Sequence, residues 1–130
     1  MKLPINLPTQ IEVQAKSRHG GDPTFFVEPG EVYRFEVLPG QRWKDWWIPS
    51  GPKGYFNFLL WFAPPRLKGV NCFALCGTIG QDEQHHFHIG EKLERYEVPV
   101  AGELYFFPND AYDYYDNNKG SIRLTMTRLQ

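Results

Sequence analysis

The sequence predicts an all-β fold, a single antiparallel β-sandwich of jelly-roll type. Aromatic residues make up 16% of the 130 residues, and the chain contains 12 glycines and 11 prolines. This composition favours short strands joined by tight turns over helices. Several short segments alternate apolar and polar side chains between Gly or Pro residues, and no long segment shows helical periodicity with caps. A chain of this length forms one domain, which we expect to span residues 1–130.

The pattern of short alternating segments predicts about eight strands. In residues 31–38, Tyr33, Phe35 and Val37 alternate with polar residues, as a half-buried strand requires. The other predicted strands are residues 11–15, 24–27, 71–79, 87–89, 93–98, 103–107 and 121–129. The Gly- and Pro-rich residues 16–23 predict a loop. Residues 40–69 contain all four tryptophans and an apolar run at 58–62, which predicts large aromatic loops.

Charge and hydropathy exclude several classes of protein. Lys and Arg number 14 against 15 Asp and Glu, a net charge of −1, which argues against nucleic-acid binding and against a polybasic membrane surface. No segment approaches the roughly 18 apolar residues of a membrane helix, so we expect no membrane insertion. The first ten residues show no signal peptide, which predicts a cytoplasmic or non-classically released protein. Cys72 and Cys76 would lie ~13 Å apart on one strand, so we expect two free buried thiols.

Residues 109–120 concentrate oxygen-bearing side chains between two predicted strands. Asp110, Asp113 and Asp116 precede the first cation of the segment, Lys119. Three carboxylates in an ordered loop repel one another, and Ca²⁺, which takes six to eight oxygen ligands, would relieve that repulsion. The spacing is not that of an EF-hand. The alternative interpretation is a solvated turn, because Asp, Asn and Gly are ordinary turn residues.

The same segment resembles a known calcium loop. The chain contains, in this order, Gly102-Glu103-Leu104, three aromatic residues, Asn109-Asp110, a six-residue spacer and Asn117-Asn118-Lys119-Gly120. This order is similar to the calcium loop of the PA-IL-like family of calcium-dependent galactophilic bacterial lectins. Weaker similarity extends upstream, to Glu12-Val13 before a Gly-rich loop and to Pro29-Gly30-Glu31-Val32. The resemblance implies a β-sandwich of the galactose-binding-domain type and a protein without catalytic activity.

The resemblance also implies a set of ligands. In that family, two sugar hydroxyls complete the calcium shell. By position, Asp110 supplies a carboxylate, Tyr114 a backbone carbonyl, and Asn117 and Asn118 their side-chain oxygens. A further carbonyl comes from residues 43–45, and we assign it to Lys44. The implied sugar-binding residues are Asp110, Ala111, Tyr114, Asn117 and Trp43.

Two departures from the family concern the sugar. The family's Val-Pro-Gly-Thr spacer is Ala111-Tyr112-Asp113-Tyr114 here, and its sugar-contacting His and Gln in the middle loop have no match. Aromatic rings pack on the apolar face of a pyranose, so those polar contacts can be replaced by Trp43, Trp46, Trp47, Tyr112 or Tyr114. A galactose-type glycan is the expected partner. A homo-oligomer is expected too, because weak single sites gain avidity when subunits are joined.

Two other functions remain open from the sequence. The first is a protein-interaction domain without sugar binding, in which the calcium loop is structural or vestigial. The second is a cupin-like metal enzyme that uses His86 and His88, which would share one face of a strand. Gly80, His86 and His88 resemble the first half of the cupin signature, but no Glu follows at the required spacing.

Overall fold

The computed structural model describes residues 1–56 and 64–130 and confirms the all-β sandwich. The strands are β1 (Thr9–Gln14), β2 (Gly20–Val27), β3 (Val32–Val37), β4 (Trp43–Asp45), β5 (Ile48–Ser50), β6 (Leu75–Ile79), β7 (His86–His88), β8 (Lys92–Glu97), β9 (Gly102–Pro108), β10 (Asn118–Lys119) and β11 (Ser121–Arg128). A single-turn 3₁₀ helix, η1 (Tyr115–Asn117), precedes β10. No helix in the described ranges is long and apolar enough to cross a membrane.

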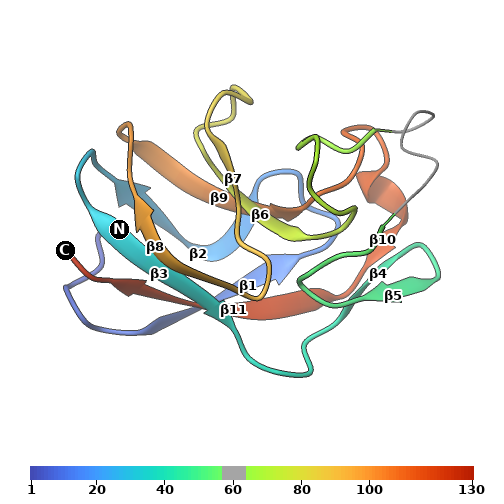
Figure 1. Ribbon diagram of the computed structural model, residues 1–130, viewed down its shortest axis with the longest axis horizontal. Coiled ribbons are helices and arrows are strands. Elements are labelled where there is room, and N and C mark those ends of the chain that lie inside the picture. Colours follow the sequence, from blue (N-terminus) through green and yellow to red (C-terminus); the bar gives the residue numbers. More distant parts are fainter. Residues whose placement is uncertain (57–63) are drawn as a thin grey trace.

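Eight of the strands form one antiparallel sheet that folds back on itself. Their order is β7-β6-β9-β2-β1-β11-β3-β8 (Figure 1). The two ends of this order face each other, because Phe87 of β7 stacks on Tyr96 of β8 with ring centroids 3.9 Å apart. Phe35 of β3 lies in the interior between them, 5.7 Å from the Phe87 ring and 5.8 Å from the Phe106 ring of β9. The sheet is therefore a nearly closed sandwich around an aromatic core.

The predicted loop at residues 16–23 is too long, because β2 begins at Gly20. The glycines that indicated a loop instead allow a β-bulge. The register of β2 against β9 shifts between Gly20 and Phe25, and Gly21 has a φ of +114°, which side chains rarely adopt. A Cβ on Gly21 would lie 2.9 Å from the Phe106 ring. β2 pairs with β9 on one side and, at Asp22, with β1 on the other, so it links the two halves of the sandwich.

The predicted strand at residues 71–79 begins too early, since β6 starts at Leu75. Phe73 has a φ of +65°, which is incompatible with extended backbone, and its N–H donates to the carbonyl of Asn109 at 2.7 Å. Cys72 consequently lies before the strand and Cys76 within it. Both cysteines are buried, as the sequence predicts.

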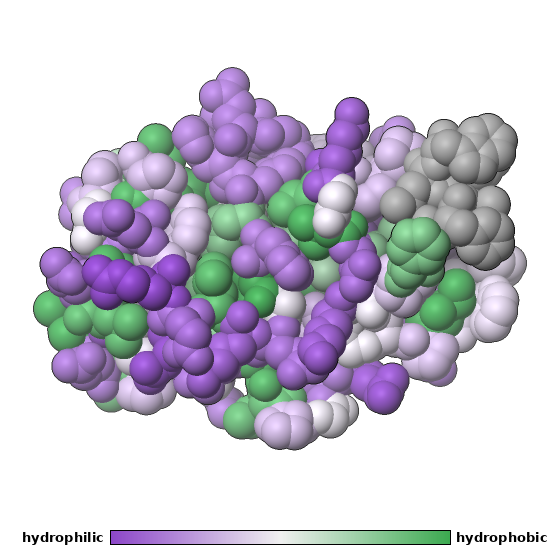
Figure 2. Space-filling model, viewed as in Figure 1, coloured by the Kyte–Doolittle hydropathy of each residue, from purple (hydrophilic) through white to green (hydrophobic). Residues whose placement is uncertain are grey.

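The sequence did not predict a second, three-stranded sheet in the order β10-β4-β5. β4 and β5 lie in the segment expected to form only large loops. Each has three residues, which is too short for an alternation of apolar and polar side chains to predict a strand. This small sheet brings residues 43–50 beside residues 118–119. The apolar run at residues 58–62 lies outside the described residues. On the face shown in Figure 2, apolar residues appear in small separate patches among hydrophilic ones.

Candidate metal centre

Three polar residues from different strands converge beside the predicted calcium loop. Asp110 follows β9, Asn118 is the first residue of β10, and Asp45 is the last residue of β4. The antiparallel register places Asn118 directly opposite Asp45, and paired residues of neighbouring strands point to the same face of a sheet. The small sheet therefore positions a distant carboxylate next to the loop.

Asn118 is wholly buried, and its side-chain amide is only partly satisfied. Its Nδ2 donates to the carbonyl of Ala15 and to Oδ2 of Asp110, both at 3.0 Å. These two acceptors fix the orientation of the amide, since only the nitrogen can donate. The other atom, Oδ1, is buried without a hydrogen-bond partner. A buried oxygen left in this way costs about 1–3 kcal/mol.

Asp110 is almost entirely buried and lacks a cationic partner among the described residues. Its Oδ1 accepts from the N–H of Ala111 at 2.8 Å, and its Oδ2 accepts from Asn118. The pKa of the Asp110 carboxyl is raised to about 6. Burial is the larger cause, and repulsion by the nearby Asp45 carboxylate is the second. Two hydrogen bonds act against this rise without cancelling it. The loop thus holds a carboxylate in surroundings that disfavour its charge.

Asp45 is held by the hydroxyl of Tyr55, which donates to its Oδ2. Burial and this carboxylate together raise the pKa of Tyr55 above its ordinary range, so Tyr55 stays a neutral donor. Asp45 and Asp110 are close enough to interact, and no described cation contributes to the pKa of Asp110. Like charges in such a place require compensation from outside the chain.

These donors fit a hard divalent cation. Two carboxylates and an unpaired amide oxygen are the ligand types that Ca²⁺ prefers, and a cation would remove both the repulsion and the unsatisfied oxygen. Within residues 1–56 and 64–130, no three His, Cys, Asp or Glu side chains are grouped to hold a metal. A metal at this place therefore needs amide and backbone carbonyl oxygens in addition to the carboxylates, as calcium sites commonly use.

The other predicted loop ligands lie next to this cluster but face solvent more. Tyr114 is about half exposed, and its N–H donates to the carbonyl of Ala111 at 2.9 Å, which closes a turn before η1. Asn117 ends η1 and is exposed, and Ala111 is partly exposed beside Asp110. Whether the Tyr114 carbonyl and the Asn117 amide bind a metal stays a prediction.

The two predicted residues of β4 lie on opposite faces of the small sheet. Trp43 is 1% exposed and packs edge-to-face on Phe73 at a centroid distance of 5.5 Å, so its ring belongs to the core and does not reach the loop surface. Lys44 is exposed and alternates with its neighbours, so its side chain points away from Asn118 and Asp45. Its backbone carbonyl stays a predicted ligand.

Sequence reasoning did not identify Asp45 as a side chain of this site. It also left Asn109 without a role, although Asn109 is wholly buried. Asn109 holds the segment 67–71: its Oδ1 accepts from the N–H of Leu67 at 2.8 Å, and its Nδ2 faces the carbonyls of Leu67, Val70 and Asn71. In the adjacent pair, the Asn109 amide therefore fixes a neighbouring loop, and the Asp110 carboxylate belongs to the polar cluster.

His86 and His88, the pair proposed for a cupin-like centre, do not form a metal site with other described residues. His86 Nε2 lies 2.5 Å from Oε2 of Glu83, and its ring packs on Phe107. Burial lowers the pKa of His86, although Glu83 opposes that shift. His88 is exposed. His86 is therefore engaged in a close contact with Glu83 and an aromatic contact with Phe107 within the fold.

No family model matches the chain, and no curated protein matches it. A solved structure described as the EclA N-terminal domain, a PllA-like lectin, is similar to it with a TM-score of 0.65. The two share 19% sequence identity over 93% of this chain and 94% of that one. At this identity the likeness shows the fold, which is the β-sandwich of a lectin domain.

Proposed function

We propose that this protein binds carbohydrate through a calcium ion held by Asp110, Asn118 and neighbouring loop oxygens. The buried and unpaired Oδ1 of Asn118, beside two carboxylates, carries the proposal. The lectin-like fold supports carbohydrate binding, and the loop's resemblance to the PA-IL-like family supports calcium and a galactose-type glycan. We also propose that the protein is not an enzyme.

The chain's own residues would prepare this site in three ways. Asp110 supplies the buried negative charge, and Asn118 is oriented by its bonds to Ala15 and Asp110, which leave its Oδ1 without a partner. Tyr55 fixes the rotamer of Asp45. Bound calcium would supply coordination positions that two neighbouring sugar hydroxyls can fill in place of water. Because the ligands are already positioned, little ordering is required when the sugar binds.

Trp46 and Trp47 are suited to contact the sugar ring. They form the two-residue turn between β4 and β5, directly after Asp45, and are 61% and 68% exposed. Their rings meet edge-to-face with centroids 6.3 Å apart. Exposed indoles beside a metal site can pack on the apolar face of a pyranose, whereas the buried Trp43 cannot.

Calorimetric titration of the chelator-treated protein with CaCl₂, followed by methyl galactosides, tests the proposal. Wild-type protein should bind calcium, and galactoside binding should appear only after calcium is added. Asp110→Asn should abolish both, because it removes the buried one of the two carboxylates that would neutralise the ion. Asp116→Asn provides a matched control: it removes the same charge from an exposed position of the same loop, and it should bind as wild type does.

Three results would count against the proposal in different ways. Sugar binding that persists with a chelator would exclude the calcium mechanism. Calcium binding without any response on a glycan array would favour the alternative of a protein-interaction domain with a structural calcium loop. A zinc or iron response that disappears on substitution of His86 and His88 would favour the cupin-like enzyme.

We further propose that the protein works as a homo-oligomer. One shallow site per subunit gives weak binding, and joining subunits raises avidity without new contacts. Sedimentation at micromolar concentration should show a species larger than the 15.2 kDa chain. A monomer at all concentrations tested would refute this part of the proposal and leave the calcium site unaffected.

A further inference from the structure

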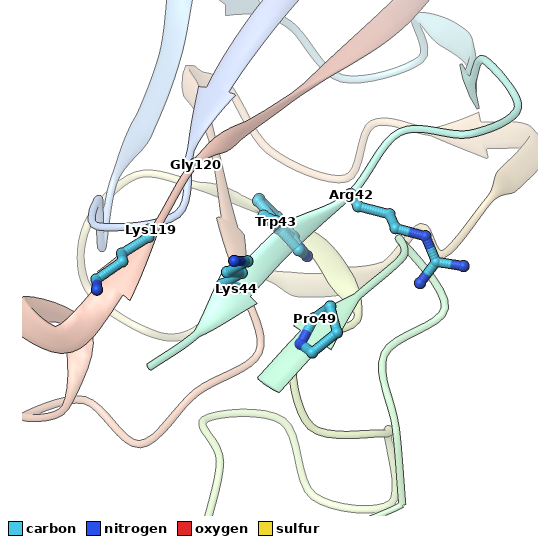
Figure 3. A pocket seen from close by; sticks show the side chains of 6 residues that line it. All are labelled: Arg42, Trp43, Lys44, Pro49, Lys119 and Gly120. Carbon is cyan, nitrogen blue, oxygen red and sulfur yellow. The ribbon is translucent and has the colours of Figure 1, made fainter. Parts of the chain in front are cut away.

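Two pockets of the described structure border the predicted calcium loop, and they differ in how their polar groups are arranged. One, of about 380 Å³, is mostly apolar and lies at the small sheet (Figure 3). Figure 3 shows that the side chains of Arg42 and Lys119 extend away from each other there. The other, of about 350 Å³, is mostly polar and is lined by residues 16–19, Tyr112, Tyr115 and Asp116. In this second pocket, polar groups from two loops face one cavity.

The polar pocket adjoins the candidate metal centre. Ala15, which precedes its first lining residue, accepts from Nδ2 of Asn118 at 3.0 Å and donates its own N–H to the carbonyl of Gly120 at 2.9 Å. In the opposite wall, Tyr112 follows Asp110 by two positions. Both walls of the pocket therefore begin next to residues of the metal centre.

The ring of Tyr112 is held in place although it is 43% exposed. The Nε–H of Arg18 donates to the carbonyl of Tyr112 at 2.7 Å, and its guanidinium carbon lies 4.7 Å from the centroid of the Tyr112 ring. The ring of His19 meets that of Tyr112 edge-to-face at 6.4 Å. Arg66 fixes the backbone of this wall, because its Nη1 donates to the carbonyl of Arg18 at 2.8 Å. The pocket is thus formed before any ligand binds.

The pocket keeps hydrogen-bonding groups that the described residues do not use. Ser17 and Arg18 are both partly buried. Within residues 1–56 and 64–130, no hydrogen bond or ion pair engages the two terminal nitrogens of Arg18 or the hydroxyls of Ser17 and Tyr112. A guanidinium only donates, whereas a hydroxyl both donates and accepts. Such a mixture matches the hydroxyls of a sugar, and an aromatic ring suits the apolar face of a pyranose.

We propose that Ser17, Arg18 and Tyr112 form a second sugar subsite, which contacts the residue linked to the calcium-bound galactoside. Asp116 in the same lining offsets part of the cationic charge, which favours a neutral sugar over an anionic one. The ligand is therefore a neutral oligosaccharide, not a single sugar. The inference rests on the proposed function, because the calcium ion positions the first sugar. Since the subsite residues are already held in place, little ordering opposes the additional contacts.

Calorimetric titrations of the calcium-loaded protein with methyl galactosides and with digalactosides of different linkages test the subsite. At least one digalactoside should bind wild-type protein about tenfold more tightly than the methyl galactosides, as a few additional hydrogen bonds allow. Arg18→Gln should reduce this gain to about twofold or less and leave the affinity for methyl galactosides unchanged, which also shows that the variant is folded. Arg95→Gln is the matched control: it removes a guanidinium from an exposed position of β8 and should keep both affinities.

Ser17→Ala provides a second variant that leaves the fold undisturbed, because the Ser17 hydroxyl makes no hydrogen bond with described residues. It should weaken only digalactoside binding, by about twofold to fivefold. Equal affinity of wild-type protein for methyl galactosides and every digalactoside would overturn the subsite and leave the calcium site intact. Equal losses for both ligands in Arg18→Gln would also overturn it. A protein that binds neither ligand would contradict the proposed function and the subsite together.

Discussion

Two buried polar clusters contact the same loop, and they differ in how completely their atoms are paired. The side chain of Arg66 is 3% exposed and stacks on Phe107 with its guanidinium carbon 3.6 Å from the ring centroid. It donates to both carboxylate oxygens of Glu83, to the carbonyl of Arg18 and to the hydroxyl of Tyr115. Asn118 instead keeps Oδ1 unpaired near two carboxylates.

This difference separates a structural role from a binding role. The guanidinium of Arg66 meets its acceptors within the chain and ties residues 18 and 83 to Tyr115. At the second cluster, Nδ2 of Asn118 has its hydrogen-bond acceptors, but Oδ1 of Asn118 has no donor and the Asp110 carboxylate has no cation among the described residues. Asn118 Oδ1 is one of six buried side-chain atoms without a hydrogen-bond partner among the described residues, and it is distinguished by the two carboxylates beside it. Because buried polar groups are almost always satisfied in native proteins, this combination is what supports a missing cation. The two clusters should therefore respond in opposite ways to mutation and to calcium.

The largest expected effect is the loss of the Arg66 cluster. Arg66→Ala should lower the free energy of unfolding by about 3–5 kcal/mol, because the Glu83 carboxylate loses its charged partner and the Tyr115 hydroxyl loses a donor. Arg95→Ala, at an exposed position, should cost less than about 0.5 kcal/mol. Urea unfolding monitored by tryptophan fluorescence measures both. If Arg66→Ala lowered the free energy of unfolding as little as Arg95→Ala does, Arg66 would not have the structural role assigned to it.

Calcium should stabilise the wild-type protein by about 2.7 kcal/mol at a hundred times its dissociation constant. Asp110→Asn should eliminate this gain and leave the metal-free protein within about 1 kcal/mol of wild type, because removing a desolvated charge offsets the loss of one hydrogen bond. Thermal melts with and without calcium measure both quantities. If Asp110→Asn destabilised the metal-free protein as much as Arg66→Ala does, Asp110 would be a structural residue and the contrast between the clusters would fail.

The pH dependence should isolate Asp110 with a smaller effect. Its pKa is raised to about 6, above the ordinary value of 3.8, so between these values the folded state holds one proton more than the unfolded state. The metal-free protein should therefore lose stability as pH rises from about 4 to about 6, by up to about 1.4 kcal/mol per pH unit. The difference between wild type and Asp110→Asn measures this contribution, and a difference that is constant with pH would contradict it.

Calcium affinity should show the opposite dependence on pH. The ion needs the carboxylate ionised, so protons compete with it and affinity should fall up to tenfold for each unit below about pH 6. Titrations at pH 5 and pH 7 check this expectation. Equal affinities at both would show that Asp110 is not a ligand.

The sequence predicted the parts of the site that one short segment contains. Asp110 and Asn118 belong to a single loop, so their spacing was visible, and the alternation in β3 and β11 predicted those strands within one residue of their ends. Asp45 and Arg66 were missed because their roles depend on strand register and on contacts between distant loops. Asn109 looked like an ordinary turn residue, because its hydrogen bonds reach a segment about forty positions away.

Backbone strain offers the smallest test of the same contrast. Glu83 and Trp46 both have left-handed backbones, with φ of +63° and +57°, which cost non-glycine residues roughly 1–2 kcal/mol. At Glu83 the ion pair with Arg66 offsets that cost. At Trp46 the ring is mostly exposed and occupies the first position of a two-residue hairpin turn, where positive φ favours glycine. The Trp46 ring contacts the exposed Trp47 ring and has no ion pair, so its backbone strain is less compensated than that of Glu83, which is consistent with a role in binding.

Trp46→Gly should therefore raise the unfolding free energy by up to about 1 kcal/mol, since relief of the strain exceeds the added chain entropy. It should also weaken sugar binding about threefold to tenfold, because the stacking contact of one aromatic ring is lost. Asn6→Gly is a matched control: Asn6 has a φ of +62° at an exposed position, and asparagine adopts this conformation at little cost, so neither stability nor sugar affinity should change. Parallel melts and galactoside titrations measure both effects. A Trp46→Gly variant that binds sugar as wild type does would remove Trp46 from the site, and one that is also less stable would show that the indole supports the fold.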